Sequence, residues 1–465
     1  MFGRYISLAI ALAFAAPLCL ARPALAENPI IQTSFTADPA PLVYDGVVYL
    51  YTSHDEDDAN GFKMRDWRLY TSTDMVNWTD KGVVASLKTF PWAVQENDAW
   101  APQVVARDGK FYLYVPISVA GWPKNVIAVA VADKPEGPFR DALGKPLIDK
   151  AEGFIDPTVW IDDDGQAYLY WGNPNLWYVK LNKDMISYSG NIENVSSKPA
   201  NYQEGPWFYK RQSKYYLAYA STCCPEGIGY AMADKPTGPW TYKGDIMDHN
   251  PGSTGNHPGI IDFKGHSYLF GFNYRLNFAE TPIHHERRSV TVTEFNYNPD
   301  GTINTQPWWD TIGVKQLHSL SPYQRVEAET MAWTSRVKRD RDRPIDWAPG
   351  IKTARSDTVG IYLTRITDLT YVKINGVEFG AGGASTFSAN VASDGKGGVI
   401  ELHLDSVDGP QIGRLTVTPT GDWNHWKVQT TQVSSAIGTH DLILVFRGEG
   451  DGPLFNLDYW SFEKS

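Results

Sequence analysis

Three acidic residues of this chain stand in similar short contexts that suit acid–base chemistry. Asp38 and Asp156 each directly precede a proline, and Glu204 precedes Gly205-Pro206. Three carboxyl groups gathered in one pocket of low dielectric cannot all stay ionised, so their proton affinities must separate. Such a separation supplies a deprotonated group that activates water and a protonated group that donates to a leaving oxygen, as glycosidic hydrolysis requires.

A single Asp-Pro pair has an ordinary explanation, as a turn or the start of a strand. In this chain, however, a proline is followed five times, after about ten residues, by a tyrosine-rich segment with strand character. The spacing of these prolines is roughly 50 to 60 residues, which predicts a five-bladed β-propeller. In equivalent blade positions, the residues at or just before the prolines would converge on one axial pocket. They are Asp38, Trp100, Asp156, Glu204 and His257.

His257 and two acidic segments raise the question of metal binding. From its position alone, His257 either ligates a cation in the channel, bonds the substrate or is structural. Residues 162–165 (Asp-Asp-Asp-Gly) resemble a calcium loop, but they stand between two predicted strands, which indicates a hairpin turn. The pair His284-His285 with Glu286 is interpreted as a loop, since a zinc site needs further spaced ligands.

The pattern of strands divides the chain into two all-β domains after a processed leader. Residues 1–26 have a charged flank, an apolar stretch and a small-residue cleavage site, which predicts a secretory signal peptide. Residues 27–320 contain the five repeats of the propeller. Residues 321–465 carry seven or more short strands with turn signals, which predicts a β-sandwich (jelly-roll) domain.

The amino-acid composition limits which kinds of molecule the protein binds. The formal net charge is −11, from 53 acidic and 42 basic residues, which argues against nucleic acid. No segment after the leader is apolar for long enough to cross a membrane, so we expect a secreted protein, extracellular or periplasmic, and a monomer. Aromatic residues make up 13% of the chain, which suits either stacking on sugars or a propeller core.

Cysteine is rare in this chain. Of its three cysteines, Cys19 lies in the predicted leader, and Cys223 and Cys224 are adjacent. Adjacent cysteines cannot connect distant strands. They are either two thiols or a vicinal disulfide, and the sequence leaves both alternatives open.

The acidic motifs, with Trp100-Ala101-Pro102 in the second repeat, resemble glycoside hydrolase family 43 over about residues 28–317. The resemblance implies a five-bladed propeller that hydrolyses with inversion. It also implies roles for individual residues, first in catalysis: Asp38 as general base, Glu204 as general acid and Asp156 as the residue that tunes and orients the acid. For the other candidates it implies sugar contacts by Trp100 and Arg275, and a calcium ion held through His257.

The C-terminal region resembles a family 6 carbohydrate-binding module. Residues 325–329 (Arg-Val-Glu-Ala-Glu) match its opening, residues 421–426 its tryptophan motif and residues 455–460 its closing strand. The resemblance implies a structural calcium ion at Glu327, Glu329 and Asp458, and sugar contacts by Trp423 and Asn456. Residues 366–372 depart from the usual pattern, so the module either binds sugar or only packs on the propeller.

Together, the two regions resemble arabinoxylan arabinofuranohydrolases. The expected function is therefore that of a secreted, inverting glycosidase that releases α-L-arabinofuranosyl side groups from arabinoxylan. One alternative is a β-xylosidase, or a bifunctional xylosidase/arabinofuranosidase, that acts on xylan fragments. Another is a propeller that binds carbohydrate without cutting it, which the presence of all three acids disfavours.

Overall fold

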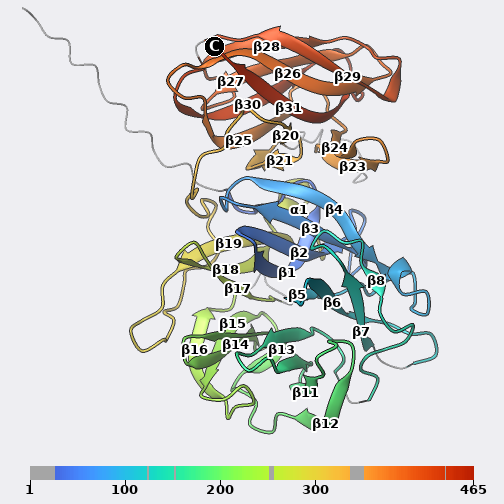
Figure 1. Ribbon diagram of the computed structural model, residues 1–465, viewed down its shortest axis with the longest axis vertical. Helices are drawn as coiled ribbons and strands as arrows, with labels where there is room; N and C mark the ends of the chain where they lie inside the picture. The colour runs from blue at the N-terminus through green and yellow to red at the C-terminus, as the bar shows by residue number, and fades with distance from the viewer. Residues whose placement is uncertain (1–26, 123–124, 151–152, 251–255, 336–349, 435) are drawn as a thin grey trace, which may run out of the picture.

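A computed structural model describes residues 27–122, 125–150, 153–250, 256–335, 350–434 and 436–465 (Figure 1). The predicted signal peptide lies outside these residues. Nearly all regular structure within them is β-strand, apart from a 3-10 turn at Leu87–Thr89 and the short helix α1 (Arg275–Glu280). No helix in the described ranges has the length and apolar character needed to span a bilayer.

Five antiparallel sheets follow one another along the first part of the chain, which confirms the predicted propeller. The first blade contains β1 (Phe35–Tyr44), β2 (Val47–Asp55), β3 (Met64–Ser72) and β4 (Trp78–Ser86). The second contains β5 (Gln103–Arg107), β6 (Lys110–Ile117), β7 (Val126–Ala132) and β8 (Arg140–Asp141). The third contains β9 (Thr158–Ile161), β10 (Ala167–Trp171), β11 (Trp177–Leu181) and β12 (Tyr188–Asn194). The fourth contains β13 (Tyr202–Arg211), β14 (Lys214–Ser221), β15 (Gly227–Ala233) and β16 (Thr241–Met247). The fifth contains β17 (Gly259–Phe263), β18 (His266–Asn273) and β19 (Ser289–Phe295).

The tyrosine-rich segments form the second strand of each blade, where their rings are buried between blades. Tyr51, Tyr114, Tyr170, Tyr216 and Tyr268 are each at most 1% exposed. The first strand of each blade lies innermost, and consecutive inner strands contact one another around the axis from β1 through β5 and β9 to β13, while β17 contacts β1. The inner strands therefore carry their starting residues to one end of a common axis.

The segment just before β1 closes the ring of blades. The side chain of Asn28 donates to the carbonyl of Val292 in β19 (3.0 Å) and accepts from the Val292 N–H (3.1 Å). The Ile30 N–H also donates to the carbonyl of Val290 (2.9 Å). The N-terminal segment thus lies beside the last blade, which unites the two ends of the propeller.

The C-terminal region is a β-sandwich, as predicted, with two facing sheets. One sheet has the order β23-β24-β31-β26-β29 with β20 beside β31, and the other has the order β22-β25-β30-β27-β28. The strands of this region are β20 (Val326–Glu327), β21 (Thr330–Met331), β22 (Trp333–Thr334), β23 (Lys352–Ser356), β24 (Gly360–Thr364), β25 (Tyr371–Glu378), β26 (Ala384–Ser393), β27 (Gly398–Leu404), β28 (Gln411–Val417), β29 (Asp422–Gln432), β30 (Thr439–Arg447) and β31 (Asn456–Lys464).

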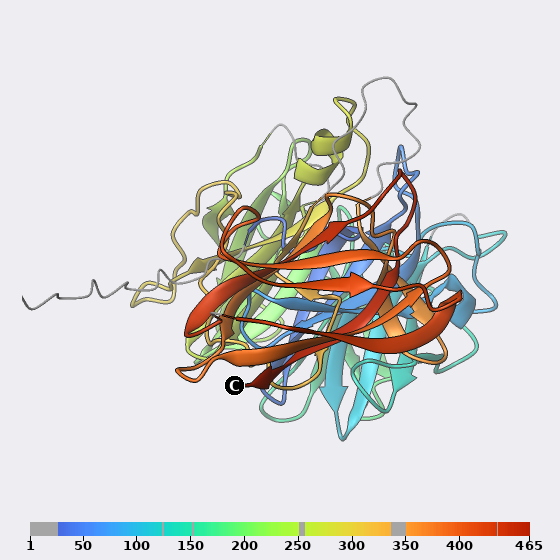
Figure 2. The ribbon, with the colours of Figure 1, turned by 90° about the horizontal axis from the view of Figure 1, so that it is seen from above.

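The sandwich packs against the first blade (Figures 1 and 2). Strand β21 pairs with β4 and extends the sheet of that blade by one strand. Across the interface, the Asn77 side chain donates to the Asn375 carbonyl (3.0 Å) and accepts from the Asn375 N–H (2.9 Å). Lys352 forms an ion pair with Asp57 (2.8 Å). The two domains therefore share backbone pairing as well as side-chain contacts.

Replacement of Asn28 tests the closure of the ring. Asn28→Ala leaves a buried N–H and a buried carbonyl of Val292 without their partners, which costs about 2–4 kcal/mol of unfolding free energy. Urea denaturation should show this loss for Asn28→Ala and almost none for Asn60→Ala, at an exposed position. Equal stability of the two variants would contradict the closure.

Candidate active site

The five residues predicted to converge do lie together. Asp38, Trp100, Asp156, Glu204 and His257 line one cavity of about 290 Å³ at the axis. Each comes from a different blade or from the segment that leads into it. The cavity therefore contains three carboxyl groups, an imidazole and an indole.

The backbone conformation at the inner strands directs these side chains toward the axis. Asp38 and Asp156 have φ angles of 51° and 57°, in the left-handed region that side chains other than glycine rarely adopt. The equivalent residue in the fourth blade is Gly205, with φ 58°. The pairing of β1 with β2, and of β13 with β14, is interrupted at these points. Such strain costs about 1–3 kcal/mol per residue and is typical of functional sites.

Gly205 also allows the close approach of His257. A Cβ atom at position 205 would lie 2.8 Å from Cδ2 of the His257 ring. The ring can therefore pack directly on the backbone that carries Glu204.

Asp38 is held by donors on several sides. The Ser53 hydroxyl donates to its Oδ2 (2.5 Å), and Arg288 donates to its Oδ1 (2.9 Å). Nδ1 of His257 lies 3.4 Å from the same Oδ1. The carboxyl is only 4% exposed, so its orientation is fixed and it faces the cavity as an acceptor.

Arg288 links Asp38 to a second buried carboxyl, that of Asp55 in β2. The guanidinium is 2% exposed and donates to Asp55 at 2.9 and 3.0 Å, and to Asp38 at 2.9 Å. Burial raises the pKa of Asp55, and the adjacent Arg288 only partly reverses that rise. Burial also disfavours the charge of Arg288, but the two carboxylates more than compensate and raise its pKa.

Asp156 and His257 form the electrostatic centre of the cavity. Burial, with smaller contributions from Glu204 and Asp38, raises the pKa of Asp156 to about 7, against the opposing effect of His257. Burial alone would lower the pKa of His257, but the carboxylates of Asp156, Asp38 and Glu204 outweigh it and raise that pKa. Nε2 of His257 lies 3.7 Å from Asp156 Oδ2. The ring is thus placed to carry a positive charge between two acids.

Glu204 is positioned through its backbone and its side chain. The N–H of Gly205 donates to Asp156 Oδ2 (3.0 Å), so Asp156 holds the peptide that follows Glu204. The Asn173 side chain donates to Glu204 Oε2. Glu204 is less buried than Asp38 and Asp156, as suits a group that must reach a leaving oxygen.

The structure places one residue predicted to contact sugar, Arg275, outside the cavity. Arg275 begins α1 and does not line the cavity. Its guanidinium donates to the carbonyl of Asn28 and lies over the ring of Trp333, 5.2 Å from the ring centre. The short helix turns this side chain toward the sandwich domain, where it supports the domain interface.

The sequence analysis did not predict three of the charged or amide side chains that line the cavity, those of Asn173, Glu226 and Arg288. Glu226 and Arg288 each directly precede a strand, β15 and β19. A charged residue directly before a strand of apolar sequence is the signal that could have identified these two. Asn173 follows β10 without any such signal.

The axial residues do not match a calcium ion in this arrangement. Both nitrogens of His257 face carboxylates, and an imidazole that carries a proton on each nitrogen cannot bind a metal. Calcium also prefers six to eight oxygen ligands. Oxygens of Asp156 and Glu204 lie within 4.8 Å of a His257 nitrogen, but the sequence predicts catalytic roles for these carboxyls. Calcium binding through His257 stays a prediction.

The predicted calcium ligands of the sandwich domain also do not surround a common point. The Arg325 guanidinium lies between Glu327 (2.8 Å) and Asp458 (3.2 Å), where it already neutralises the two carboxylates. Glu329 is buried on the side of Asp80, at the propeller. In the described part of the chain, these three carboxyls are not gathered around one point within 4.8 Å. The residues present do not fit calcium there, and the ion stays a prediction.

The predicted sugar contacts of the sandwich domain lie beside each other. The Asn456 side chain donates to the carbonyl of Trp423 (2.9 Å). Asn456 is 4% exposed, whereas Trp423 is partly exposed on β29. Asn456 therefore supports the backbone of Trp423, and only Trp423 offers a surface to a sugar. Contact of either residue with carbohydrate remains a prediction.

Local structure resolves two further alternatives of the sequence analysis. Cys223 and Cys224 form a disulfide, which settles the question of two thiols. Residues 162–165 form the hairpin turn between β9 and β10, closed by a hydrogen bond from the Asp162 N–H to the Gln166 carbonyl (2.9 Å).

Comparison with known proteins yields matches to both domains. Residues 26–303 match "Glycosyl hydrolases family 43", and residues 343–464 match "Carbohydrate binding module (family 6)". An arabinoxylan arabinofuranohydrolase of Bacillus subtilis (strain 168) is 34% identical, over 94% of this chain and 92% of its own length. A xylosidase/arabinosidase of Bacteroides ovatus is 32% identical, over 59% of this chain and 96% of its own length. A crystal structure of a family 43 arabinoxylan arabinofuranohydrolase from Bacillus subtilis, in complex with cellotetraose, superposes with a TM-score of 0.81 at 32% identity. It covers 94% of this chain and 97% of its own.

The raised pKa of Asp156 predicts a pH-dependent effect of its replacement. The folded protein keeps a proton on Asp156 up to about pH 7, which the unfolded chain releases near pH 4, so this group stabilises the fold less as the pH rises. Asn cannot ionise. Asp156→Asn should therefore raise the melting temperature more at about pH 8 than at about pH 5.

Calorimetry at the two pH values checks this expectation. Asp45→Asn is the matched control, because Asp45 is exposed in the turn after β1. A difference between wild type and Asp156→Asn that is the same at both pH values would show that Asp156 titrates normally.

Proposed function

We infer the activity of this chain from its family: it belongs to glycosyl hydrolases family 43 and carries a family 6 carbohydrate-binding module. It is therefore a glycosidase. We propose that it removes α-L-arabinofuranosyl side groups from arabinoxylan with inversion at the anomeric carbon. The observation that carries this proposal is the arrangement of Asp38, Asp156 and Glu204 in one cavity, together with a likeness to an arabinoxylan arabinofuranohydrolase over nearly the whole chain.

In the proposed reaction, Asp38 accepts a proton from a water molecule, and the oxygen of that water attacks the anomeric carbon. Glu204 gives its proton to the leaving oxygen as the glycosidic bond breaks. Asp156 holds the Gly205 N–H and thereby orients the peptide that carries Glu204. Arg288 and Ser53 fix the carboxyl of Asp38, so that it presents a defined oxygen to the water.

The size of the cavity suits one terminal sugar. A volume of about 290 Å³ accommodates a single pentose and water, at the small end of ligand pockets. Trp100 lines one side and offers an aromatic face to the sugar ring. Arabinose and xylose are isomeric pentoses, so volume alone does not separate the two substrates.

The second candidate function is removal of xylose from xylan fragments. It is favoured by the likeness of the propeller region to a protein named as a xylosidase/arabinosidase. We propose arabinofuranosidase activity as the main function because the named arabinofuranohydrolase matches both domains.

Product analysis tests the substrate. Proton NMR of arabinoxylan treated with the protein should show free arabinose, first as the β anomer, because inversion converts an α linkage into a β product. Xylose as the main product would favour the second candidate. Arabinose that first appears as the α anomer would contradict inversion.

Replacement of the two catalytic carboxyls tests their roles. Asp38→Asn and Glu204→Gln keep the shape of the side chains but remove base and acid, so each should lower kcat roughly 100- to 10,000-fold. The exposed Asp45→Asn serves as the control for Asp38→Asn. A folded Asp38→Asn protein with wild-type turnover on arabinoxylan would exclude Asp38 as the base.

Calcium and secretion remain proposals from the sequence. Metal analysis of the protein before and after dialysis against a chelator would decide whether either site holds calcium. Processing after Ala26 can be checked by N-terminal sequencing of the exported protein.

A further inference from the structure

Glu226 is a fourth carboxyl of the catalytic cavity, and the proposed reaction gives it no role. It directly precedes β15 and lines the same cavity as Glu204. Its exposed fraction is 0%. A carboxylate is costly to bury beside other acids unless it is paired or neutral. The state of Glu226 therefore needs a physical explanation.

The strand register places Glu226 beside the proposed general acid. Glu204 in β13 lies opposite Ala220 in β14, and Ala220 lies opposite Ile228 in β15. Side chains alternate along a strand, so Glu226, two residues before Ile228, points to the same side as Ile228. Both carboxyls thus occur on one face of the fourth blade, at the end nearest the axis.

The hydrogen bonds of Glu226 are those of a carboxylic acid. Its Oε2 accepts from the backbone N–H of Asn256 (2.6 Å). Its Oε1 is buried and meets no donor in the described part of the chain. An ionised oxygen in this position would lack a partner, whereas a protonated one supplies its own hydrogen and needs only an acceptor. The Glu204 carboxyl lines the same cavity and is near enough to raise the pKa of Glu226, so it can be that acceptor.

The charges around Glu226 favour the same state. Burial, and then the charge of Glu204, raise the pKa of Glu226 to about 8. The Asn256 N–H and His257 act in the opposite direction but do not cancel this rise. Burial and the neighbouring carboxylate therefore favour the neutral form of Glu226.

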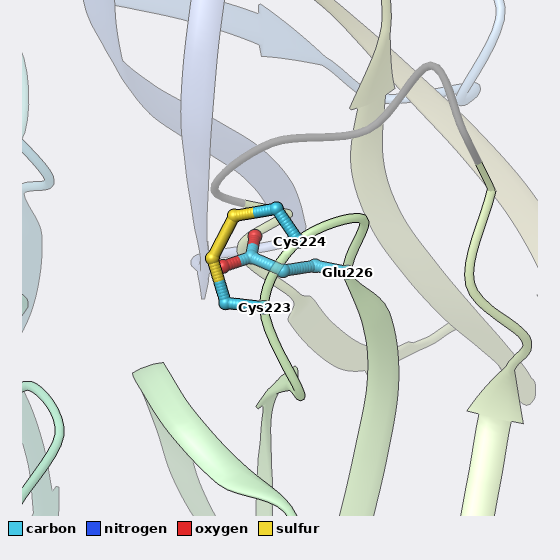
Figure 3. Close-up of side chains that lie close together, drawn as sticks. All are labelled: Cys223, Cys224 and Glu226. Carbon is cyan, nitrogen blue, oxygen red and sulfur yellow. A yellow bond between two sulfur atoms is a disulfide. The ribbon is translucent and has the colours of Figure 1, made fainter.

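The disulfide between Cys223 and Cys224 shields this carboxyl from the outside. Figure 3 shows the carboxyl group of Glu226 directed at the two sulfur atoms, and a Glu226 oxygen lies within 4.8 Å of both. The two cysteines are exposed, and Cys223 also lines the cavity. The apolar sulfur pair thus lies between Glu226 and solvent, which keeps water from competing for its proton.

We propose that Glu226 is a positioning residue that, as a neutral carboxylic acid, donates a hydrogen bond to Glu204. The inference rests on the proposed role of Glu204 as general acid. When Glu204 gives its proton to the leaving oxygen, negative charge develops on the Glu204 carboxyl. The O–H of Glu226 donates to that charge and keeps its own proton. Hydrogen bonds to a charged acceptor are about twice as strong as neutral ones, so the contact strengthens as the glycosidic bond breaks.

Two substitutions separate this role from a merely structural one. Glu226→Gln reproduces the neutral acid, because its carbonyl accepts from Asn256 and its NH₂ donates to Glu204. Glu226→Leu fills a similar volume but cannot donate. Each variant is assayed on an arabinoxylo-oligosaccharide, whose leaving sugar oxygen must be protonated. Each is also assayed on a dinitrophenyl arabinofuranoside, whose leaving group departs without a proton.

The expected result is a loss that depends on the leaving group. Glu226→Leu should lower kcat roughly 10- to 100-fold on the oligosaccharide, with little change on the dinitrophenyl substrate and a similar KM on both. Glu226→Gln should restore kcat on the oligosaccharide to within about threefold of wild type. An equal loss on both substrates, or a Gln variant as impaired as the Leu variant, would overturn the proposal.

Glu204→Gln, assayed in parallel, keeps this proposal apart from the role of Glu204 itself. If Glu204→Gln shows the leaving-group dependence and Glu226→Leu does not, only the role of Glu226 fails. If Glu204→Gln loses activity equally on both substrates, Glu204 is not the general acid. The proposed mechanism is then refuted, and with it the basis of the role of Glu226.

Discussion

A single guanidinium holds two buried carboxylates at the centre of this enzyme. Arg288 donates to Asp38 from the first strand of the first blade and to Asp55 from the second strand, while it belongs to the fifth blade itself. Its contacts therefore join the first and last blades at the proposed base, Asp38, and fix the position of that side chain. Since ions so deeply buried are stable only when paired, loss of Arg288 would leave both carboxylates without their shared guanidinium inside the ring.

Apart from Arg288, the cationic group nearest to the acids of the cavity is the imidazole of His257. His257 lies between Asp38 and Asp156, and burial, with smaller contributions from the neighbouring carboxylates, raises the pKa of Asp156 to about 7 against the opposing effect of His257. Glu226 needs no cation when it is protonated, a form that its raised pKa favours. The raised pKa values of Asp156 and Glu226 thus follow from their burial and from the charged groups beside them.

Much of this site could be predicted from the sequence because its acids recur at, or directly before, one backbone position of a repeated blade. The proline after Asp38 and Asp156 marked that position, and the same period predicted the fold. Arg288 was missed because it reaches Asp38 across 250 residues, from a strand edge outside the repeated motif. Arg275 was misplaced because its partner, Trp333, belongs to the other domain, and no local pattern reports such a contact.

The closure by Asn28 ties together backbone segments that are 264 residues apart. Contacts of such long sequence separation form late, since the intervening chain must first be ordered. The ring of blades does not require that the two ends of the propeller chain meet between the first and fifth blades. Joining the end of the fifth blade to residue 28 through a short linker, and opening the chain in an exposed hairpin of the third blade, should yield a circular permutant with an unaltered cavity.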